Sequence, residues 1–287
     1  PPFYTFVSTL LLSSGSWKDY CNELLNSLNF ACQYGIDIRG LITEVEKIQP
    51  ESRLLALRNF LARMTHHAGP AFTELPLFHI TPAERTYLDA YGHSADLAVL
   101  HYTVLRALDY NPEFVLVAPG LEQKDLQKFW TQNPFFGLFT EVLVRVKTKE
   151  GDYWFNDQDQ YGQLGACSLE GSLAYSLQTN KFFSLEVAEK MKSAKKQIIL
   201  IDMQSAGTAQ ITIRIQYFGE DFGIINKFYS ELSPEEKRRH FQEMLTSLSQ
   251  SAKALSDLTI DMEEYPGILT FSAKVDDFAV VDENFCY

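Results

Sequence analysis

Apolar residues recur along this chain with a helical period in some stretches and with a strand period in others. In the early part they return every three or four positions, which is typical of helices with one buried face. We expect helices from Ser16 to about Tyr34, around 41–45, and through 54–64. Ser16 is the expected N-cap of the first helix, because Asp19 follows it at the spacing of a capping box.

A stronger helix start lies in Thr81-Pro82-Ala83-Glu84, where threonine would cap, proline would take the first helical position and glutamate would close a capping box. Apolar residues at helical spacing then predict a core helix from Ser94, followed by a strand at 114–117. His101 lies on the apolar face of that helix, so we expect a hydrogen-bonded core histidine. Further elements are expected as a surface helix at 121–130 and two strands at 142–146 and 153–155.

From about residue 182 onward the period changes to two, which is typical of half-buried strands. We expect strands near 198–201, 211–217, 258–260 and 268–273. One helix interrupts them at Ser233, with Pro234 in its first position and Glu236 closing a capping box. The predicted fold class is therefore α+β: a helical part with a small antiparallel sheet, then a smaller strand-rich domain with one helix.

The length of 287 residues and the 46% hydrophobic content suffice for two buried cores. We divide the chain into an extended arm at 1–15, a first domain at 16–184 and a β-rich domain at 185–287. The arm is expected to be the tail of a preceding domain, and the start at Pro1 rather than Met suggests a processed or excised piece.

Charge and composition exclude several kinds of partner and cofactor. The net charge of −12 argues against nucleic acid or an anionic membrane as a partner. A protein surface that binds phosphates needs a concentration of positive charge. No apolar run is long enough to cross a bilayer, so we expect no membrane insertion within this chain. We expect no metal and no cofactor, since phosphate loops are absent and the four cysteines lie far apart. The cysteines are expected to be apolar fillers: Cys21, Cys32, Cys167 and Cys286.

Residues 92–100 read Gly-His-Ser-Ala-Asp-Leu-Ala-Val-Leu. They resemble the Gly-Asp-Cys-x-Asp-x-Ala-x-Leu motif of the transglutaminase-like superfamily, a branch of the papain-like cysteine hydrolases. In particular, the chain resembles large exported bacterial proteins in which such a core lies between two domains of unknown function. The resemblance covers about 16–180, and it implies a papain-like core with Ser94 in the position of the catalytic cysteine.

The other two catalytic positions of that family also carry different residues here. Residues 139–146 fit the frame Phe-x-His-x-x-Val-x-Val, with Glu141 in the place of the histidine. Residues 153–156 resemble the frame Tyr-Trp-Leu-Asp, with Asn156 in the place of the aspartate and Asp157 as the alternative third member.

These changes remove the chemistry on which the family depends. A thiolate attacks because a helix N-terminus and a histidine lower its pKa, whereas a serine hydroxyl needs a base to accept its proton. Simpler roles fit each residue: Ser94 as the helix N-cap, Glu141 as a solvated carboxylate, and Asn156 and Asp157 as turn formers.

The leading hypothesis is a catalytically inactive binding or structural module, exported from a bacterium, whose partner is a protein, peptide or glycan. The alternative is an active hydrolase or acyltransferase that uses Ser94, with Glu141 or His93 as base. A third hypothesis places a metal among His93, His101 and Glu141. For the remaining histidines a role at a helix end is expected rather than metal binding: His66, His67 and His79.

Overall fold

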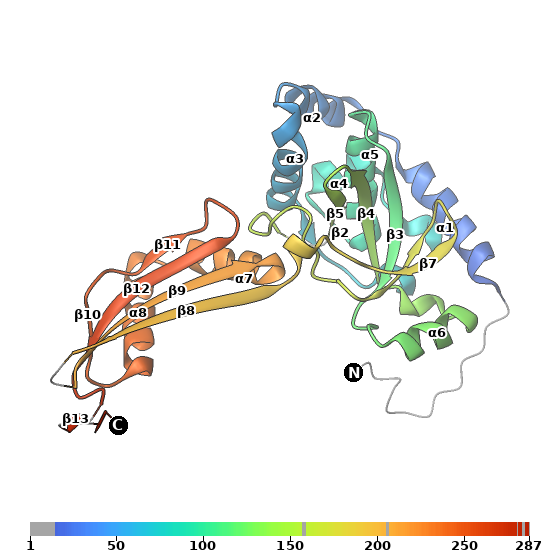
Figure 1. Cartoon of the computed structure of the whole chain (residues 1–287). Helices are drawn as coiled ribbons and strands as arrows, with labels where there is room; N and C mark the ends of the chain where they lie inside the picture. Colours follow the sequence, from blue (N-terminus) through green and yellow to red (C-terminus); the bar gives the residue numbers. More distant parts are fainter. Residues whose placement is uncertain (1–14, 157–158, 205–206, 280, 283–284, 287) are drawn as a thin grey trace. The chain divides into compact units, whose positions relative to one another are not determined.

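The computed structural model describes residues 15–156, 159–204, 207–279, 281–282 and 285–286 (Figure 1). The chain forms two compact units. The first comprises the described residues up to Gln160 together with Leu164–Glu189, and the second comprises Tyr161–Gln163 and the described residues from Lys190 onward. The predicted arm at 1–15 lies outside the described residues except for Gly15. The predicted boundary between residues 184 and 185 separates two domains that would each fold independently. It stays a prediction.

Helices and a sheet make up the first unit, which belongs to the α+β class as predicted. Its helices are α1 (Trp17–Ala31), α2 (Ile36–Glu46), α3 (Pro50–Met64), α4 (Ala83–Asp89), α5 (Ser94–Ala107) and α6 (Lys124–Gln132). Its sheet strands are β3 (Pro112–Ala118), β4 (Glu141–Thr148), β5 (Gly151–Phe155), β6 (Leu173–Ser176) and β7 (Lys181–Ser184). Short 3₁₀ turns at Phe72–Glu74, Leu77–His79 and Phe136–Leu138 and the two-residue strands β1 (His66–His67) and β2 (Tyr91–Gly92) complete it.

The five strands lie in the order β5-β4-β3-β6-β7 and are antiparallel throughout. The paired residues Phe114 and Val144 direct their side chains to the face that α5 covers, and both are fully buried. Tyr102 of α5 stacks on Phe114, with the ring centroids 4.0 Å apart. The central helix and the middle of the sheet therefore form one core. The pattern predicted β3, β4 and β5 but did not predict β6 or β7.

Of the two capping signals predicted in the first unit, one is confirmed and one is wrong. Ser16 caps α1, because its hydroxyl accepts a hydrogen bond from the backbone N–H of Asp19. The capping box predicted at Thr81 is wrong, since α4 begins after Pro82 and no side chain caps it. The Glu84 carboxylate instead accepts hydrogen bonds from the backbone N–H groups at the start of α2, namely those of Gly35, Asp37 and Ile38. The Glu84 carboxylate, which the local pattern predicts as a cap of α4, thus caps α2 instead.

In its described residues, the second unit contains a five-stranded antiparallel sheet and two α-helices. Its elements are β8 (Ala194–Met203), β9 (Ala209–Phe218), α7 (Gly219–Glu231), α8 (Pro234–Leu248), β10 (Ala252–Ala254), β11 (Thr259–Asp261) and β12 (Gly267–Val275). The strand order is β10-β12-β9-β8, and β11 also pairs with β12. A 3₁₀ turn at Glu189–Met191 precedes them, and a small hairpin of β13 (Val281–Asp282) and β14 (Phe285–Cys286) follows.

The capping box at Ser233 is confirmed, with Pro234 at the helix start and the backbone N–H of Ser233 donating to Glu236. The prediction of one helix in this part of the chain is wrong, because α7 precedes α8. Helix α7 follows β9 directly and has no side-chain cap, so the usual start signal is missing. Its buried residues Phe222 and Tyr229 contribute to the core of the second unit.

None of the helices that the structure describes is long and apolar enough to cross a membrane.

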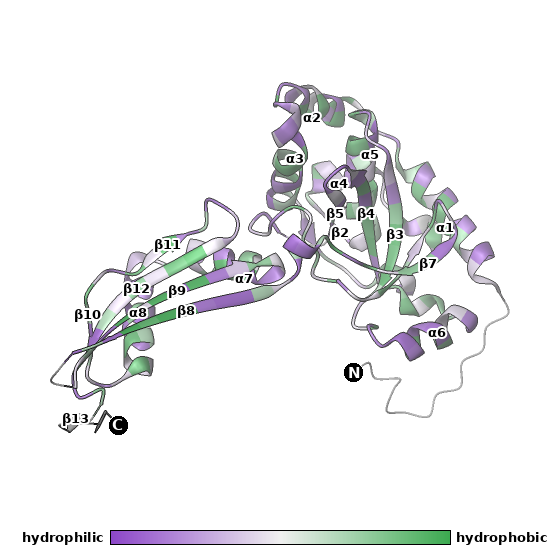
Figure 2. Ribbon diagram, in the orientation of Figure 1, coloured by the Kyte–Doolittle hydropathy of each residue, from purple (hydrophilic) through white to green (hydrophobic). Residues whose placement is uncertain are grey.

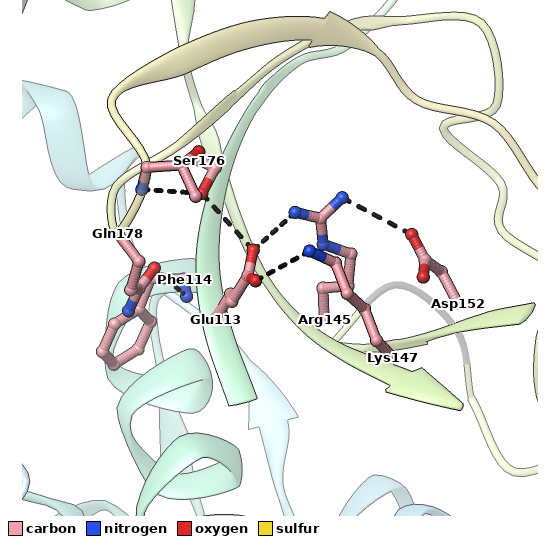
Figure 3. Close-up of polar contacts among 8 residues, drawn as sticks. Glu113, Phe114, Arg145, Lys147, Asp152, Ser176 and Gln178 are labelled. Carbon is pink, nitrogen blue, oxygen red and sulfur yellow. Dashed lines mark hydrogen bonds and ion pairs between the residues drawn. The ribbon is translucent and has the colours of Figure 1, made fainter. Parts of the chain in front are cut away.

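An ion network lies on the face of the first sheet that α5 does not cover (Figure 3). Glu113 of β3 lies directly opposite Arg145 of β4, and its carboxylate accepts hydrogen bonds from Arg145 and, at 3.0 Å, from Lys147. Arg145 also reaches Asp152 at 3.4 Å. The side chains of Glu113 and Arg145 are only 12% and 11% exposed, so solvent screens their attraction weakly.

Burial acts to raise the pKa of Glu113, but the hydrogen bonds and charges of Arg145 and Lys147 outweigh it and hold the pKa below its usual range. We expect Glu113→Gln to lower the free energy of unfolding at pH 7 by about 1–3 kcal/mol. A carboxylate with a lowered folded-state pKa stabilises fully above its unfolded pKa and loses that effect as the pH falls through the folded value. Urea unfolding should therefore show the two proteins converging in acid.

Glu51→Gln is the matched control, because Glu51 is exposed and its substitution should change stability by less than about 0.5 kcal/mol. A difference between wild type and Glu113→Gln that stays constant on acidification would contradict the ionic account.

Candidate functional site

The loop before α5 holds the motif residues by backbone hydrogen bonds. His93 is the N-cap: its Nδ1 accepts from the backbone N–H of Asp96 at 3.3 Å, and the Asp96 carboxylate accepts from the backbone N–H of His93 at 3.2 Å. Ser94 is thus the first residue inside the helix, and its prediction as the N-cap is wrong. The cap moves one residue earlier because an imidazole nitrogen can accept the bond that a serine oxygen usually accepts.

Asp96 connects this loop to the segment before α4. Its carboxylate also accepts the backbone N–H of Thr81 at 2.6 Å, and the residue is only 4% exposed. Gly92 leaves the space that this arrangement requires, because a Cβ at that position would lie 2.6 Å from the Cβ of Asp96. The glycine and the aspartate of the motif therefore both have roles in folding.

Ser94 bridges the start of α5 to the start of β4. Its hydroxyl accepts a hydrogen bond from the backbone N–H of Val142 at 2.7 Å, and the residue is 1% exposed. Strand β5 pairs with β4 only as far as Val144, so the outer edge of β4 has no strand partner at Val142. In an antiparallel ladder both backbone groups of a residue point to the same edge. Ser94 therefore supplies the acceptor that a longer β5 would have supplied.

Asn156, the residue after β5, completes the same arrangement. Its side-chain Nδ2 donates to the carbonyl of Val142 at 2.8 Å and to the carbonyl of Ser94 at 2.9 Å. Two carbonyl acceptors fix which end of the amide is the nitrogen. The backbone φ of Asn156 is 72°, in the left-handed region that asparagine tolerates better than most residues. These three residues form what we call the Ser94–Val142–Asn156 network.

Glu141 lies next to this network without belonging to it. Its backbone pairs with Val117, and its side chain is half-buried. Within the described ranges the Glu141 carboxylate makes no hydrogen bond and no ion pair. The structure thus brings the positions of Ser94, Glu141 and Asn156 to one place, while Asp157 lies outside the described residues. Their identity as former catalytic positions stays a prediction.

A cavity of about 530 Å³ opens beside the network. Its lining comes from the end of α3, from β1, from α5, from the start of β4 and from the loops after β3 and β5: Ala62, Thr65, His66, His67, Leu97, His101, Pro119, Glu141, Asn156, Asp159, Ser168 and Leu169. The volume falls in the range of small-molecule sites. Ser94 does not line it.

His101 contributes a neutral imidazole to this cavity. Its Nδ1 lies 2.9 Å from the carbonyl of Leu97, so Nδ1 carries the proton and Nε2 carries the lone pair. Burial lowers the pKa of His101 to about 4, with Arg58 acting in the same direction. The prediction of a hydrogen-bonded core histidine is confirmed. At neutral pH, His101 can accept a hydrogen bond from a ligand.

His93 is poorly placed to act as a base for Ser94. Its Nδ1 already accepts the backbone N–H of Asp96, and burial lowers the pKa of His93 despite the opposing effect of the Asp96 charge. No hydrogen bond joins the Ser94 hydroxyl to an imidazole or a carboxylate among the described residues.

The sequence pattern did not identify His66 and His67 as cavity residues. They form β1, directly after α3 and paired with β2, rather than a helix end. A two-residue parallel bridge leaves no periodic signal in a sequence. No group of three or more His, Cys, Asp or Glu side chains in the described ranges could hold a metal ion.

No family model matches the chain, and no curated protein matches it either. Among solved structures, the chain is similar to a putative protease from Parabacteroides distasonis ATCC 8503, with 12% sequence identity and a TM-score of 0.46. The similarity covers 90% of this chain and 52% of that chain, so the chain spans about half the length of the solved structure.

The network predicts that the donor end of Asn156 is essential. Asn156→Asp would set a carboxylate oxygen against two carbonyl oxygens, and we expect it to lower the free energy of unfolding by about 2–3 kcal/mol. Asn180→Asp is the matched control. Asn180 also has a positive φ, 54°, but it uses its side-chain oxygen, which accepts from the Tyr175 hydroxyl.

Chemical denaturation of the two variants at pH 7 makes the comparison, with Asn180→Asp expected within about 0.5 kcal/mol of wild type. Equal losses in both variants would show that the network does not depend on the amide nitrogen.

Proposed function

We propose that the first unit is a transglutaminase-like core that no longer catalyses and that binds a peptide or glycan segment in its cavity. The observation that carries this proposal is the state of Ser94: its hydroxyl is buried, engaged by the Val142 N–H and absent from the cavity lining. A nucleophile has to reach its substrate and pass its proton to a base. Ser94 is arranged for neither step.

The composition of the cavity supports binding of a polar ligand that donates hydrogen bonds. His101 offers an acceptor nitrogen, Asn156 an amide and Glu141 a carboxylate without a partner among the described residues. Apolar surface from Leu97 and Leu169 lies among these groups. Hydroxyl and amide groups of a glycan or a peptide can donate to such acceptors, while apolar contacts supply affinity. We extend the proposal to an exported bacterial polypeptide, on the resemblance of residues 92–100 alone.

Turnover distinguishes this proposal from an active hydrolase or acyltransferase. Wild type and Ser94→Ala are incubated with a fluorescent amine and a glutamine peptide, and separately with peptide and ester substrates. We expect rates equal to buffer in both proteins. Ser94→Ala should also lose about 1–2 kcal/mol of stability, because the Val142 N–H loses its acceptor. A wild-type rate that disappears in a folded Ser94→Ala protein would establish catalysis and reject the proposal.

Binding is tested separately with a glycan array and a random hexapeptide library. We expect the wild-type protein to bind one class of ligand on the array or in the library. The Kd for that ligand should rise about tenfold or more in Glu141→Ala, because the variant loses an acceptor that contributes about one hydrogen bond to a charged group. Glu51→Ala, an exposed glutamate of α3 outside the cavity lining, is the control. Affinity that is unchanged by Glu141→Ala would place any binding elsewhere.

A further inference from the structure

Strand β8 of the second unit is a long apolar strand at the edge of its sheet. All ten of its residues are exposed, and the isoleucines and leucine at its centre are exposed by 40–64%. Its pairing among the described residues is with β9 alone, so its other side presents free backbone N–H and C=O groups. Figure 2 shows the hydrophobic centre of β8.

The helices leave the inner face of β8 uncovered. Ile199 and Ile201 pair with Ile213 and Ile211 of β9, and paired residues place their side chains on the same face of the sheet. The β9 residues are buried under the helices, at 3% and 4% exposed, whereas Ile199 and Ile201 are 49% and 50% exposed. The apolar layer thus continues beyond the cover that α7 and α8 provide.

Natural proteins rarely leave such an edge open. Edge strands are normally short, bulged or interrupted by charges along their length, because an apolar edge with free backbone groups recruits another strand. In β8 the charges lie only towards the ends, with Lys195 and Lys196 before the apolar centre and Asp202 after it. The arrangement is that of a strand that receives a partner.

The charges of β8 are complementary to those of a second β8. A two-fold axis perpendicular to a sheet places each residue and its symmetry mate on the same face, so the axis of an antiparallel pair passes between two copies of one residue. With the axis at Ile199, Lys196 of each copy lies directly opposite Asp202 of the other. An axis at Ile198 or Leu200 would place Lys196 opposite Leu200 or Gln204 instead.

We propose that β8 pairs antiparallel with β8 of a second copy of this chain, about a two-fold axis at Ile199, to form one sheet that continues across both copies. In this register Ile198 lies opposite Leu200, and the two copies of Ile199 meet at the axis. The pairing satisfies the free backbone edge, buries the apolar centre and forms two Lys196–Asp202 pairs by symmetry. Lys196 makes no ion pair among the described residues of its own chain, so it is available for this contact.

Charge reversal tests both the partner and the register. Lys196→Asp alone or Asp202→Lys alone places like charges opposite each other, and each should raise the dimer Kd about tenfold or more in sedimentation velocity at low salt. An equimolar mixture of the two variants restores opposite charges across the axis and should recover dimers at the wild-type concentration. The double variant Lys196→Asp with Asp202→Lys should do the same. Circular dichroism confirms that each variant is folded.

Cysteine cross-linking provides a readout that does not depend on charge. Opposed residues have Cα atoms about 4.5–5.5 Å apart, within the range of a disulfide, so Ile199→Cys should cross-link two copies on oxidation. Lys196→Cys should not, because the two copies of residue 196 lie six positions apart along the strands, about 20 Å. Wild type reports any cross-linking through the native cysteines.

Recovered dimers in the mixture together with selective Ile199→Cys cross-linking would support the proposal. A wild-type protein that stays monomeric at high concentration would overturn it and would leave the edge for a strand of a different protein. A dimer that is insensitive to the charge reversals, or that cross-links equally through Lys196→Cys, would overturn it as well, since its interface would lie elsewhere.

Discussion

The first unit depends on how the backbone of Val142 is satisfied at the point where β4 extends beyond β5. A buried N–H and C=O without partners would each cost about 1–3 kcal/mol. The hydroxyl of Ser94 and the amide of Asn156 provide the partners, so the start of α5 is fixed to the start of β4. Together with the apolar core, this connection positions α5 over the sheet and so contributes to one wall of the cavity.

The same connection supports the proposal that Ser94 is not a nucleophile. A hydroxyl that accepts a backbone N–H in a buried site is held in one orientation and has one lone pair fewer to offer. The amide nitrogen of Asn156 donates to the carbonyls of Ser94 and Val142, so this end of the side chain holds the network together. A nucleophile requires access to its substrate and a base for its proton. Ser94 is only 1% exposed, and its hydroxyl is bonded to the Val142 N–H.

Local chemistry decided which parts of the fold could be predicted from the sequence. The caps at Ser16 and Ser233 are predictable because their partners lie three residues away along the chain. The role of Glu84 is not predictable in this way, because its partners at the start of α2 lie nearly fifty residues away and only the tertiary structure brings them together. Helix α7 follows a strand without a side-chain cap, so it lacks the local start signal. The apolar run at 198–201 predicts a strand in β8, but it does not indicate that the strand is exposed.

The candidate site shows the same division. The pattern placed Ser94, Glu141 and Asn156 in one region through a resemblance, but it could not indicate that two of them complete a strand ladder. Gly92 and Asp96 agree with the motif of an enzyme family, yet the structure assigns both to close packing and helix capping. Folding alone explains both residues, so agreement with the motif at these positions carries no information about activity. Ser94, which the resemblance places at the position of a nucleophile, accepts the backbone N–H of Val142 here.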